Sequence, residues 1–403
     1  MAALFKNALE QVGQSHKADD DIIDRFNHRF TVVLLVTFTT FVSAKQFIGE
    51  PISCWAPAEF SGPQVAYTNS ICWLKGTYYL AVDRQSIPHR TQNSEFRIAY
   101  YQFVPYILLV MALFFYLPHM FWRNMSRRIG FDLRSIIQNI KEVSKTDMEE
   151  VALQIHIALE YNLSKHVVDR HKTLNRLLEK FQCSRRHHTH LSLLYIFAKI
   201  LYMINCLCQF YFLSTLLSFP FHTFGTEWIS TMLRKLDTTA NNESKWFPRV
   251  VMCDFMVRHL GSNHHWRSVQ CNLPINLFNE LIFLILWAWF MLLSSLTFVS
   301  LILCCILIYM NIGCTFIYKY LHMNLSKSTE KQQDEFIEKY LKYDGILVLR
   351  IIAHNTNDII MANLVGALFK IYLNSIKKEN NDDDNNHQIQ SNGHYERVDT
   401  SSI

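Results

Sequence analysis

Long apolar stretches alternate with polar segments along the chain, and their lengths predict how often the chain crosses a membrane. A helix rises ~1.5 Å per residue, so ~20 apolar residues span a ~30 Å hydrocarbon core. The stretch at residues 100–122 meets this length and contains no Lys, Arg, Asp or Glu. Predominantly apolar stretches also lie at residues 31–48, 191–220 and 281–310. The pattern therefore predicts four transmembrane helices.

Basic residues gather at one end of the predicted spans, and this asymmetry predicts their direction. They precede the first and third spans and follow the second: Arg25, Arg29, Arg123, Arg127, Arg128, Arg185 and Arg186. Lys and Arg concentrate in cytoplasmic flanks of membrane helices. Both termini are therefore expected in the cytoplasm, with residues 49–99 and 221–280 as two extracellular loops.

The polar segments outside the spans predict further helices. Residues 1–30 combine a charged linker with a short amphipathic helix, whose apolar positions are Leu4, Phe5, Ala8, Leu9 and Val12. Residues 123–190 and 311–376 have helical periodicity and are expected to pack together as a helical cytoplasmic dome. Residues 377–403 are poor in apolar residues and are expected to be disordered. The expected fold is an all-α membrane protein.

The composition agrees with a membrane protein and argues against other classes. Half of the residues are hydrophobic and 18% are charged, below the ~25% of soluble domains. The net charge of +5 is too small to indicate a nucleic-acid partner. We expect no cleavable signal peptide, because residues 1–30 are polar and mixed in charge. No catalytic motif has the strand–helix context it needs, so neither an enzyme activity nor a cofactor is expected.

The ten cysteines divide between the predicted compartments. Cys54 and Cys72 lie in the first outer loop and Cys253 and Cys271 in the second, and each pair is separated by eighteen positions. Disulfides form in oxidising compartments, whereas cytosolic thiols stay reduced. Four extracellular cysteines allow three pairings, and their spacing alone does not decide between bonds within a loop and bonds between loops.

Polar residues and a proline within the spans are candidates for roles in a channel. Thr37 and Thr40 belong to a hydroxyl-rich first span, where hydroxyls mark helix contacts or a water-filled wall. Lys45, near the outer end of this span, either reaches the headgroups or contributes a charge to a pore. Pro105 lies inside the predicted second span, where it would remove a backbone hydrogen bond and kink the helix.

Two other motifs have chemistry of their own. Cys183, His187, His188 and His190 form a cluster that resembles a metal site. A polar collar at the membrane surface is the preferred interpretation, because structural metal sites draw ligands from two separated elements, and no metal is expected. Asn242 begins an Asn-Glu-Ser acceptor for N-glycosylation in the second outer loop.

Five motifs resemble the innexins, the invertebrate gap-junction proteins. YYQFVPY at residues 100–106 resembles a family signature, with Phe103 where the family usually has Trp. The outer loops contain GEPISCW at 49–55, FPRVVMCDF at 247–255 and VQCNLPINLFNE at 269–280, which are all similar to innexin phrases. DGILVLRIIAHN at 344–355 resembles a cytoplasmic stretch of the family. The resemblance covers about residues 20–370.

This resemblance implies a structure, an assembly and a function. It pairs Cys54 with Cys271 and Cys72 with Cys253. It implies a ring of eight innexin subunits, of one or several kinds, which docks with the ring of a neighbouring cell in a plasma-membrane gap junction. Ions and small metabolites would pass through its pore, and membrane lipids would surround it. The pore-lining candidates are Ala2, Leu4, Phe5, Ala8, Thr37, Thr40 and Lys45.

Three alternatives stay open at this point. A pannexin-like hemichannel would remain unpaired and release metabolites, and a glycan at Asn242 would then block docking. A tetraspan adhesion or scaffold protein would have the same spans without a pore. The amphipathic segment at residues 1–14 would, in a further alternative, lie on the inner membrane surface.

Overall fold

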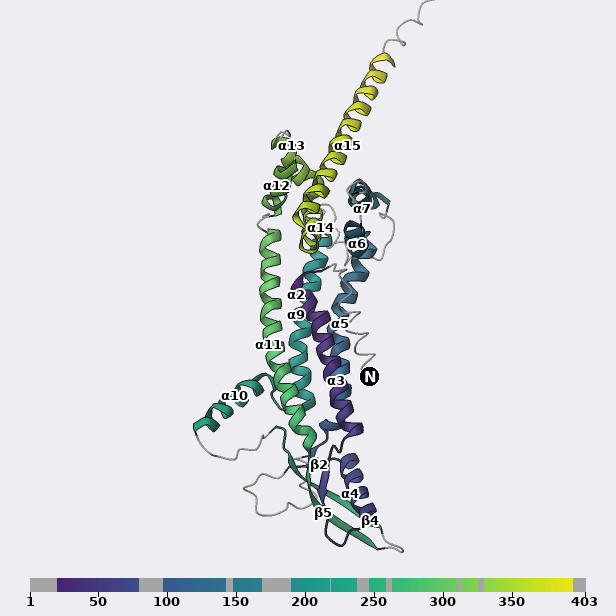
Figure 1. The fold of residues 1–403 in the computed structure, drawn as a ribbon. Coiled ribbons are helices and arrows are strands. Elements are labelled where there is room, and N and C mark those ends of the chain that lie inside the picture. Colours follow the sequence, from purple (N-terminus) through teal and green to yellow (C-terminus); the bar gives the residue numbers. More distant parts are fainter. Residues whose placement is uncertain are drawn as a thin grey trace, which may run out of the picture. The chain divides into compact units, whose positions relative to one another are not determined.

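The computed structural model describes residues 20–79, 97–142, 148–168, 190–217, 219–237, 246–258, 263–309, 313–324 and 330–393. The chain divides into two compact units. Unit 1 consists of residues 1–24, 119–200 and 300–403, and unit 2 consists of residues 25–118 and 201–299. Figure 1 shows the elements in both units.

Among the described residues, five helices are long and apolar enough to cross a membrane. They cover Ile22–Ile48, Val104–Ile129, His190–Leu217, Pro274–Leu307 and Asp358–Lys377. The first comprises α2 (Ile22–Arg25), the π-helical turn η1 (Phe26–Phe30) and α3 (Thr31–Ile48). The next three are α5 (Val104–Ile129), α9 (His190–Leu217) and α11 (Pro274–Tyr309). The fifth is the beginning of α15 (Asp358–Gly393), which the sequence assigned to the cytoplasmic region.

The second span differs at both ends from its sequence prediction of residues 100–122. Tyr100–Gln102 forms a separate 3₁₀ turn, η3, and α5 begins at Val104. At its other end α5 continues beyond Trp122, because its basic last turn favours the negative end of the helix dipole. Gly130 then ends the helix with φ of 101°, a conformation that glycine adopts without strain. The fourth span, predicted from residue 281, begins at Pro274.

Unit 2 contains a sheet that the all-α prediction missed. Its five antiparallel strands are in the order β1-β5-β4-β2-β3. The strands are β1 (Ser53–Trp55), β2 (Thr77–Tyr78), β3 (Arg97–Ile98), β4 (Val250–Arg258) and β5 (His264–Asn272). Val251, Cys253 and Phe255 are buried on one face of β4, which is the alternation that a half-buried strand requires. The fold is therefore mostly helical, with a sheet built from both predicted outer loops.

Two helices of unit 2 also lie in the predicted outer loops. The first, α4 (Gly62–Lys75), begins with a capping box in which Ser61 and Gln64 satisfy each other's backbone. It packs beside β1 and β4, and Figure 1 shows α4 next to β4. The second, α10 (Phe221–Asp237), precedes the β4–β5 hairpin. Phe221 and Phe224 of α10 join Phe247 and Phe283 in the aromatic core of unit 2.

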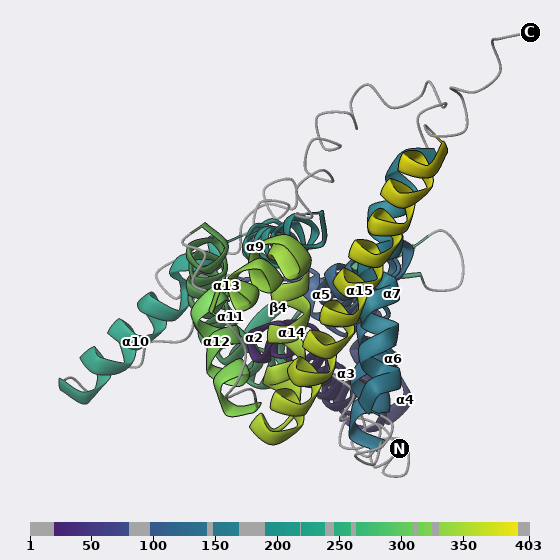
Figure 2. The same ribbon diagram turned by 90° about the horizontal axis from the view of Figure 1, so that it is seen from above.

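Unit 1 is a helical bundle around a separate apolar core. Besides parts of the long helices it contains α6 (Leu133–Glu142), α7 (Met148–Val168), α12 (Gly313–Asn324), α13 (Glu330–Glu335), η5 (Phe336–Leu341), α14 (Lys342–Asn355) and α15. Figure 2 shows α15 beside α7, and α15 also packs against α12 and α14. Its residues Leu364, Val365, Leu368 and Phe369 are buried in the core of unit 1.

The helix α15 extends past residue 377, from which the sequence predicts a disordered tail. It continues to Gly393 through a strongly polar sequence. Helix nucleation is costly whereas each added residue costs little, so the packed first half of α15 can extend into residues that would not form a helix alone. Residues 394–403 lie outside the described part of the chain.

Candidate functional site

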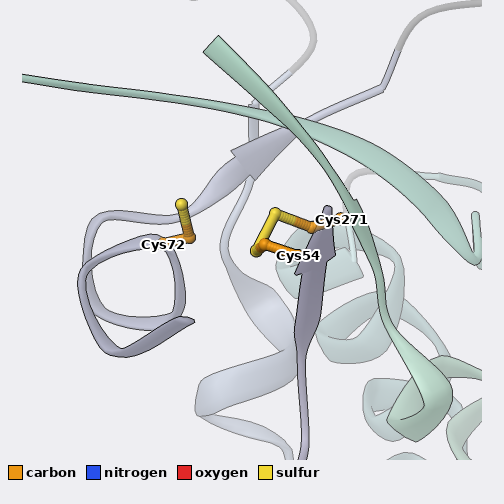
Figure 3. Close-up of side chains that lie close together, drawn as sticks. All are labelled: Cys54, Cys72 and Cys271. Atoms are coloured by element: carbon orange, nitrogen blue, oxygen red, sulfur yellow. A yellow bond between two sulfur atoms is a disulfide. The ribbon is translucent and has the colours of Figure 1, made fainter. Parts of the chain in front are cut away.

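The first disulfide joins strands from the two predicted outer loops. Cys54 on β1 lies opposite Cys271 on β5 in the antiparallel register, and their sulfur atoms are bonded (Figure 3). Both side chains are buried. The bond connects positions 217 residues apart and follows the pairing that the innexin resemblance implies. It fixes the chain just after α3 to the chain just before α11.

The second disulfide fastens a helix to the same sheet. Cys72 of α4 is bonded to Cys253 of β4, and both side chains are completely buried. The backbone N–H of Cys54 donates to the side-chain oxygen of Asn69 at 3.0 Å, which fixes α4 to β1 as well. All four cysteines therefore pair between the loops, not within them.

Three of these sulfur atoms lie close enough together to resemble a metal site. Cys54, Cys72 and Cys271 are close neighbours in Figure 3, with sulfur atoms within 4.8 Å of one another. A metal binds the thiolate form of cysteine. Each of these sulfurs is in a disulfide, so none is available as a thiolate ligand. The cluster is a covalent cross-link of the sheet.

Hydrogen bonds connect this disulfide-linked region to the apolar helices of unit 2. The Gln46 amide at the end of α3 donates to the carbonyl oxygen of Tyr101 at 2.8 Å. Gln102, in the same 3₁₀ turn, donates to the carbonyl oxygen of Trp73 in α4. The Tyr101 ring is completely buried and lies 4.8 Å from the Trp73 ring, measured between centroids. The YYQ part of the sequence motif therefore joins α3, α4 and α5.

The predicted pore-lining residues of the first span lie on α3. Thr37 donates to the carbonyl oxygen of Val33 and Thr40 to that of Thr37, each at 2.8 Å, so both hydroxyls are satisfied within the helix. Thr37 is half-buried and Thr40 is exposed. Lys45 is half-buried, with its Nζ 5.6 Å from the centroid of the Phe278 ring. The cation therefore lies against an aromatic face of α11, an arrangement that favours a positive charge.

The structure corrects the role predicted for Pro105. It is the second residue of α5, and the first helical turn has no acceptor for an amide at that position. Pro105 therefore interrupts no hydrogen-bond ladder and starts the helix instead. The proline inside the helix is Pro118. The prediction was wrong because the apolar stretch begins before the helix does.

A buried ion pair that the sequence pattern did not predict lies in unit 1. Lys199 of α9 is 1% exposed, and its Nζ lies 2.8 Å from Oδ1 of Asp24 and 2.8 Å from Oγ of Ser300. The Tyr195 hydroxyl donates to Oδ2 of Asp24 at 3.1 Å. The sequence contains one signal for this pair, which is a lysine inside the apolar stretch at residues 191–220 and a run of aspartates before the first span. Opposite charges in apolar surroundings are expected to pair.

A second buried carboxylate caps a long helix of unit 1. Asp344 of α14 accepts hydrogen bonds from the backbone N–H groups of Leu191 and Ser192, at 3.2 and 2.9 Å, and from the Ser192 hydroxyl at 2.9 Å. These donors are at the N-terminus of α9, where orphan N–H groups and the helix dipole favour an anion. Burial raises the pKa of Asp344 to about 6, against the lowering effect of these hydrogen bonds.

Close packing and one buried acid connect α10 to α11. The indole N–H of Trp287 donates to the carbonyl oxygen of His222 at 2.9 Å. The Trp287 ring also packs directly on Gly225, where a Cβ atom would overlap it. Glu280 accepts from the Trp228 indole at 3.2 Å and pairs with Arg249 at 3.4 Å. Arg249 and Glu280, which belong to the two innexin-like motifs of the second outer loop, therefore lie together at the contact between α10 and α11.

Several predicted residues lie outside the described part of the chain. These are the pore candidates Ala2, Leu4, Phe5 and Ala8, the glycosylation candidate Asn242, and Cys183, His187 and His188 of the rejected metal cluster. His190 of that cluster is the first residue of α9.

Comparisons with known proteins give one consistent answer. A model of the innexin family matches residues 20–372. Innexin unc-9 of Caenorhabditis elegans is 36% identical over 379 residues, which cover 91% of this chain and 95% of that protein. Innexin-19 of Caenorhabditis briggsae is 30% identical, covering 92% of this chain and 89% of its own length. Innexin-11 of C. elegans is also 30% identical, covering 89% and 80%.

Proposed function

Since this chain belongs to the innexin family, we propose that it is a subunit of a gap-junction channel through which ions and small metabolites pass between adjacent cells. The proposed assembly is a ring of subunits, eight if it follows the family, in the plasma membrane. Its partners would be copies of this chain or other innexins, and the docked ring of the neighbouring cell.

The disulfide-linked sheet is the observation that carries this proposal. Two disulfides, Cys54–Cys271 and Cys72–Cys253, join both predicted outer loops into one sheet with a buried core. Binding a partner costs little conformational entropy when the surface is rigid beforehand, and the two disulfides make this sheet rigid. Such a surface is suited to docking with an identical sheet on a second ring. Trp55, which is 82% exposed on β1, supplies an aromatic side chain of the kind enriched in protein interfaces.

Four of the five apolar helices are proposed to cross the membrane, with both termini in the cytoplasm. The apolar part of α15 is buried on nearly all sides from Met361 to Phe369 by the helices of unit 1. A helix covered all round by protein explains its hydrophobicity without lipid. The basic residues Arg123, Arg127 and Arg128 at the end of α5 support a cytoplasmic location for unit 1.

The helix α3 is proposed as the main pore wall. The apolar window of the first helix is 17% buried within the subunit and that of α11 22%, compared with 50% for α5 and 39% for α9. Of the two less buried helices, α3 has the hydroxyl-rich sequence that suits a water-filled wall. Surface that the subunit itself leaves open is available to neighbouring subunits and to a pore. Hydrated solutes would pass passively, and selectivity would depend on charges near the narrowest ring. Residues 1–14 are proposed to contribute to that ring.

Single-channel recording with cysteine labelling tests the pore assignment. Thr40→Cys, in a background of Cys208→Ser and Cys305→Ser, should make the open-channel current fall stepwise when a charged thiol reagent is applied. Leu35→Cys is the matched control, since Leu35 is on the same helix and completely buried. Equal responses at the two positions would contradict α3 as the pore wall.

Glycan mapping separates docking from the pannexin-like alternative. A glycan at Asn242 in the second outer loop would obstruct the docking surface. The proposal therefore expects this position to be unmodified in junctional protein. Full occupancy in protein at cell contacts would favour an unpaired hemichannel. A protein that reaches the membrane without any conductance would favour the adhesion or scaffold alternative.

A further inference from the structure

A cavity of about 500 Å³ lies within unit 1, beside the buried Lys199 ion pair. Residues from the start of the first helix, from α9, from the end of α11 and from α14 line it. Its size is within the ~300–1,000 Å³ of small-molecule sites. The family-typical channel function gives this cavity no role.

One face of α14 forms a wall of the cavity. Ile346 and Leu347 are followed one turn later by Arg350 and a further turn later by His354, and all four line the cavity. Residues three and four apart share a helix face. Tyr343 and Ile351 of the same helix line the cavity as well. The basic side chains of this wall, Arg350 and His354, lie toward the end of α14, which matches a molecule with an apolar chain and an anionic head.

Another part of the cavity wall belongs to a helix that is proposed to cross the membrane. Leu303 and Ile306 of α11 line the cavity and are 52% and 45% exposed. They lie in the last turns of the apolar stretch that ends at Leu307. An acyl chain that lies along this part of α11 can therefore enter the cavity from the hydrocarbon.

Four charged side chains line the cavity, the carboxylates Asp20 and Asp21 and the cations Lys199 and Arg350, and of these Arg350 suits an anionic head. Lys199 is neutralised by Asp24 at 2.8 Å and by Asp21 at 3.5 Å. Asp20 is 3.5 Å from His119. Arg350 is half-buried and has no carboxylate within 4 Å among the residues that the structure describes. A partly buried guanidinium without an anion is costly, and a phosphate or carboxylate would form bidentate hydrogen bonds with it.

We propose that this cavity binds an anionic phospholipid of the inner leaflet, with an acyl chain against α11 and the headgroup phosphate at Arg350 and His354. The lipid would connect the first helix, α9, α11 and α14 of one subunit. This inference rests on the proposed membrane location, which supplies the lipid. Its test measures bound lipid and does not require channel activity.

Native mass spectrometry of the full chain in lipid nanodiscs tests the proposal. The nanodiscs contain equal amounts of phosphatidylserine and phosphatidylcholine, and the retained lipids are counted. Wild-type protein should retain phosphatidylserine in preference. Arg350→Gln should reduce this retention about tenfold or more, as expected for loss of a charge-assisted hydrogen bond. Leu347→Trp, which fills the cavity, should reduce retention of both lipids.

A matched arginine and a cross-link make the result decisive. Arg134→Gln changes another half-buried arginine of unit 1 that does not line the cavity, and it should retain lipid like the wild type. Should Arg350→Gln not fold, a photoactivatable phosphatidylserine on wild-type protein must label residues 303–307 or 346–354. Equal retention by Arg350→Gln and Arg134→Gln would overturn the proposal, as would labelling elsewhere only. Retention that appears only after deletion of residues 2–14 would show that this segment fills the cavity instead.

Discussion

Nζ of Lys199 lies 2.8 Å from Oδ1 of Asp24, and both side chains are almost completely buried. The pair joins α9 to the short helix that leads into α3. Removing one member of a buried pair leaves an uncompensated charge, which costs ~3–5 kcal/mol, whereas replacing both can be nearly neutral. Moving α2 away from α9 would separate the two buried charges, and the free-energy cost of that separation keeps α2 in place.

The first prediction concerns this pair. Lys199→Met and Asp24→Asn should each lower the unfolding temperature of the solubilised protein strongly, because each leaves a buried charge without its main partner. The double variant should recover most of the loss. Lys319→Met is the control, since its pair with Asp358 is exposed and such pairs contribute ~0–1 kcal/mol. Additive losses in the double variant would contradict this energetic coupling.

The second prediction concerns the disulfides. Cys54→Ser and Cys72→Ser should each abolish coupling between cells, because loss of a disulfide costs ~2–5 kcal/mol and loosens the sheet. Cys305→Ser provides the comparison, since Cys305 is a free, exposed cysteine on α11. The measurement is junctional conductance normalised to surface protein. A comparable loss in Cys305→Ser would mean that the sheet has no special role.

The third prediction concerns the contact between α10 and α11. Gly225→Ala should destabilise the protein by ~1–3 kcal/mol, because its new methyl group would overlap the Trp287 ring. Gly62→Ala is a matched control at the first position of α4, where no atom lies within 4 Å of a built Cβ. Thermal unfolding in detergent measures both. Equal unfolding temperatures for the two variants would show that the helices can separate without cost.

The fourth prediction is a pH dependence at Asp344. Its pKa is raised from 3.8 to about 6, so the folded chain keeps a proton that the unfolded chain releases between these values. The unfolding free energy of the wild type should therefore fall, relative to Asp344→Asn, as pH rises through this window. The expected change is about 3 kcal/mol. Unfolding curves of both proteins at several pH values between 4 and 7 measure it, and a constant difference would contradict the shift.

Sequence patterns predicted the long helices better than the parts between them. Length and hydrophobicity identify a membrane helix directly, because the hydrocarbon thickness fixes both. The sheet was not predicted although Val251, Cys253 and Phe255 alternate on β4, because a strand forms only with partners that this local pattern does not identify. The sheet depends on the pairing of β4 with β5 and of β5 with β1, and β1 lies in a different loop of the sequence.

The sequence predicted those parts of the candidate site that depend on single residues or on the innexin-like motifs. The cysteines were identifiable from their positions, whereas their pairing came from the resemblance. Pro105 was misplaced because an apolar run does not mark the first helical residue. The partners of Lys199 are far apart in sequence, at Asp24 and Ser300, and only tertiary structure brings them together. The cap on α9 was missed for the same reason.

Electrical recording from paired cells that express only this chain tests the central claim most directly. The account predicts a junctional conductance that appears with the wild type in both cells and is lost when Cys54→Ser replaces it in either cell. Both proteins must be present at the cell contact, as shown by surface labelling. Wild-type protein at the contact without any junctional conductance, alone or beside another innexin, would contradict the proposal that this chain forms a gap-junction channel.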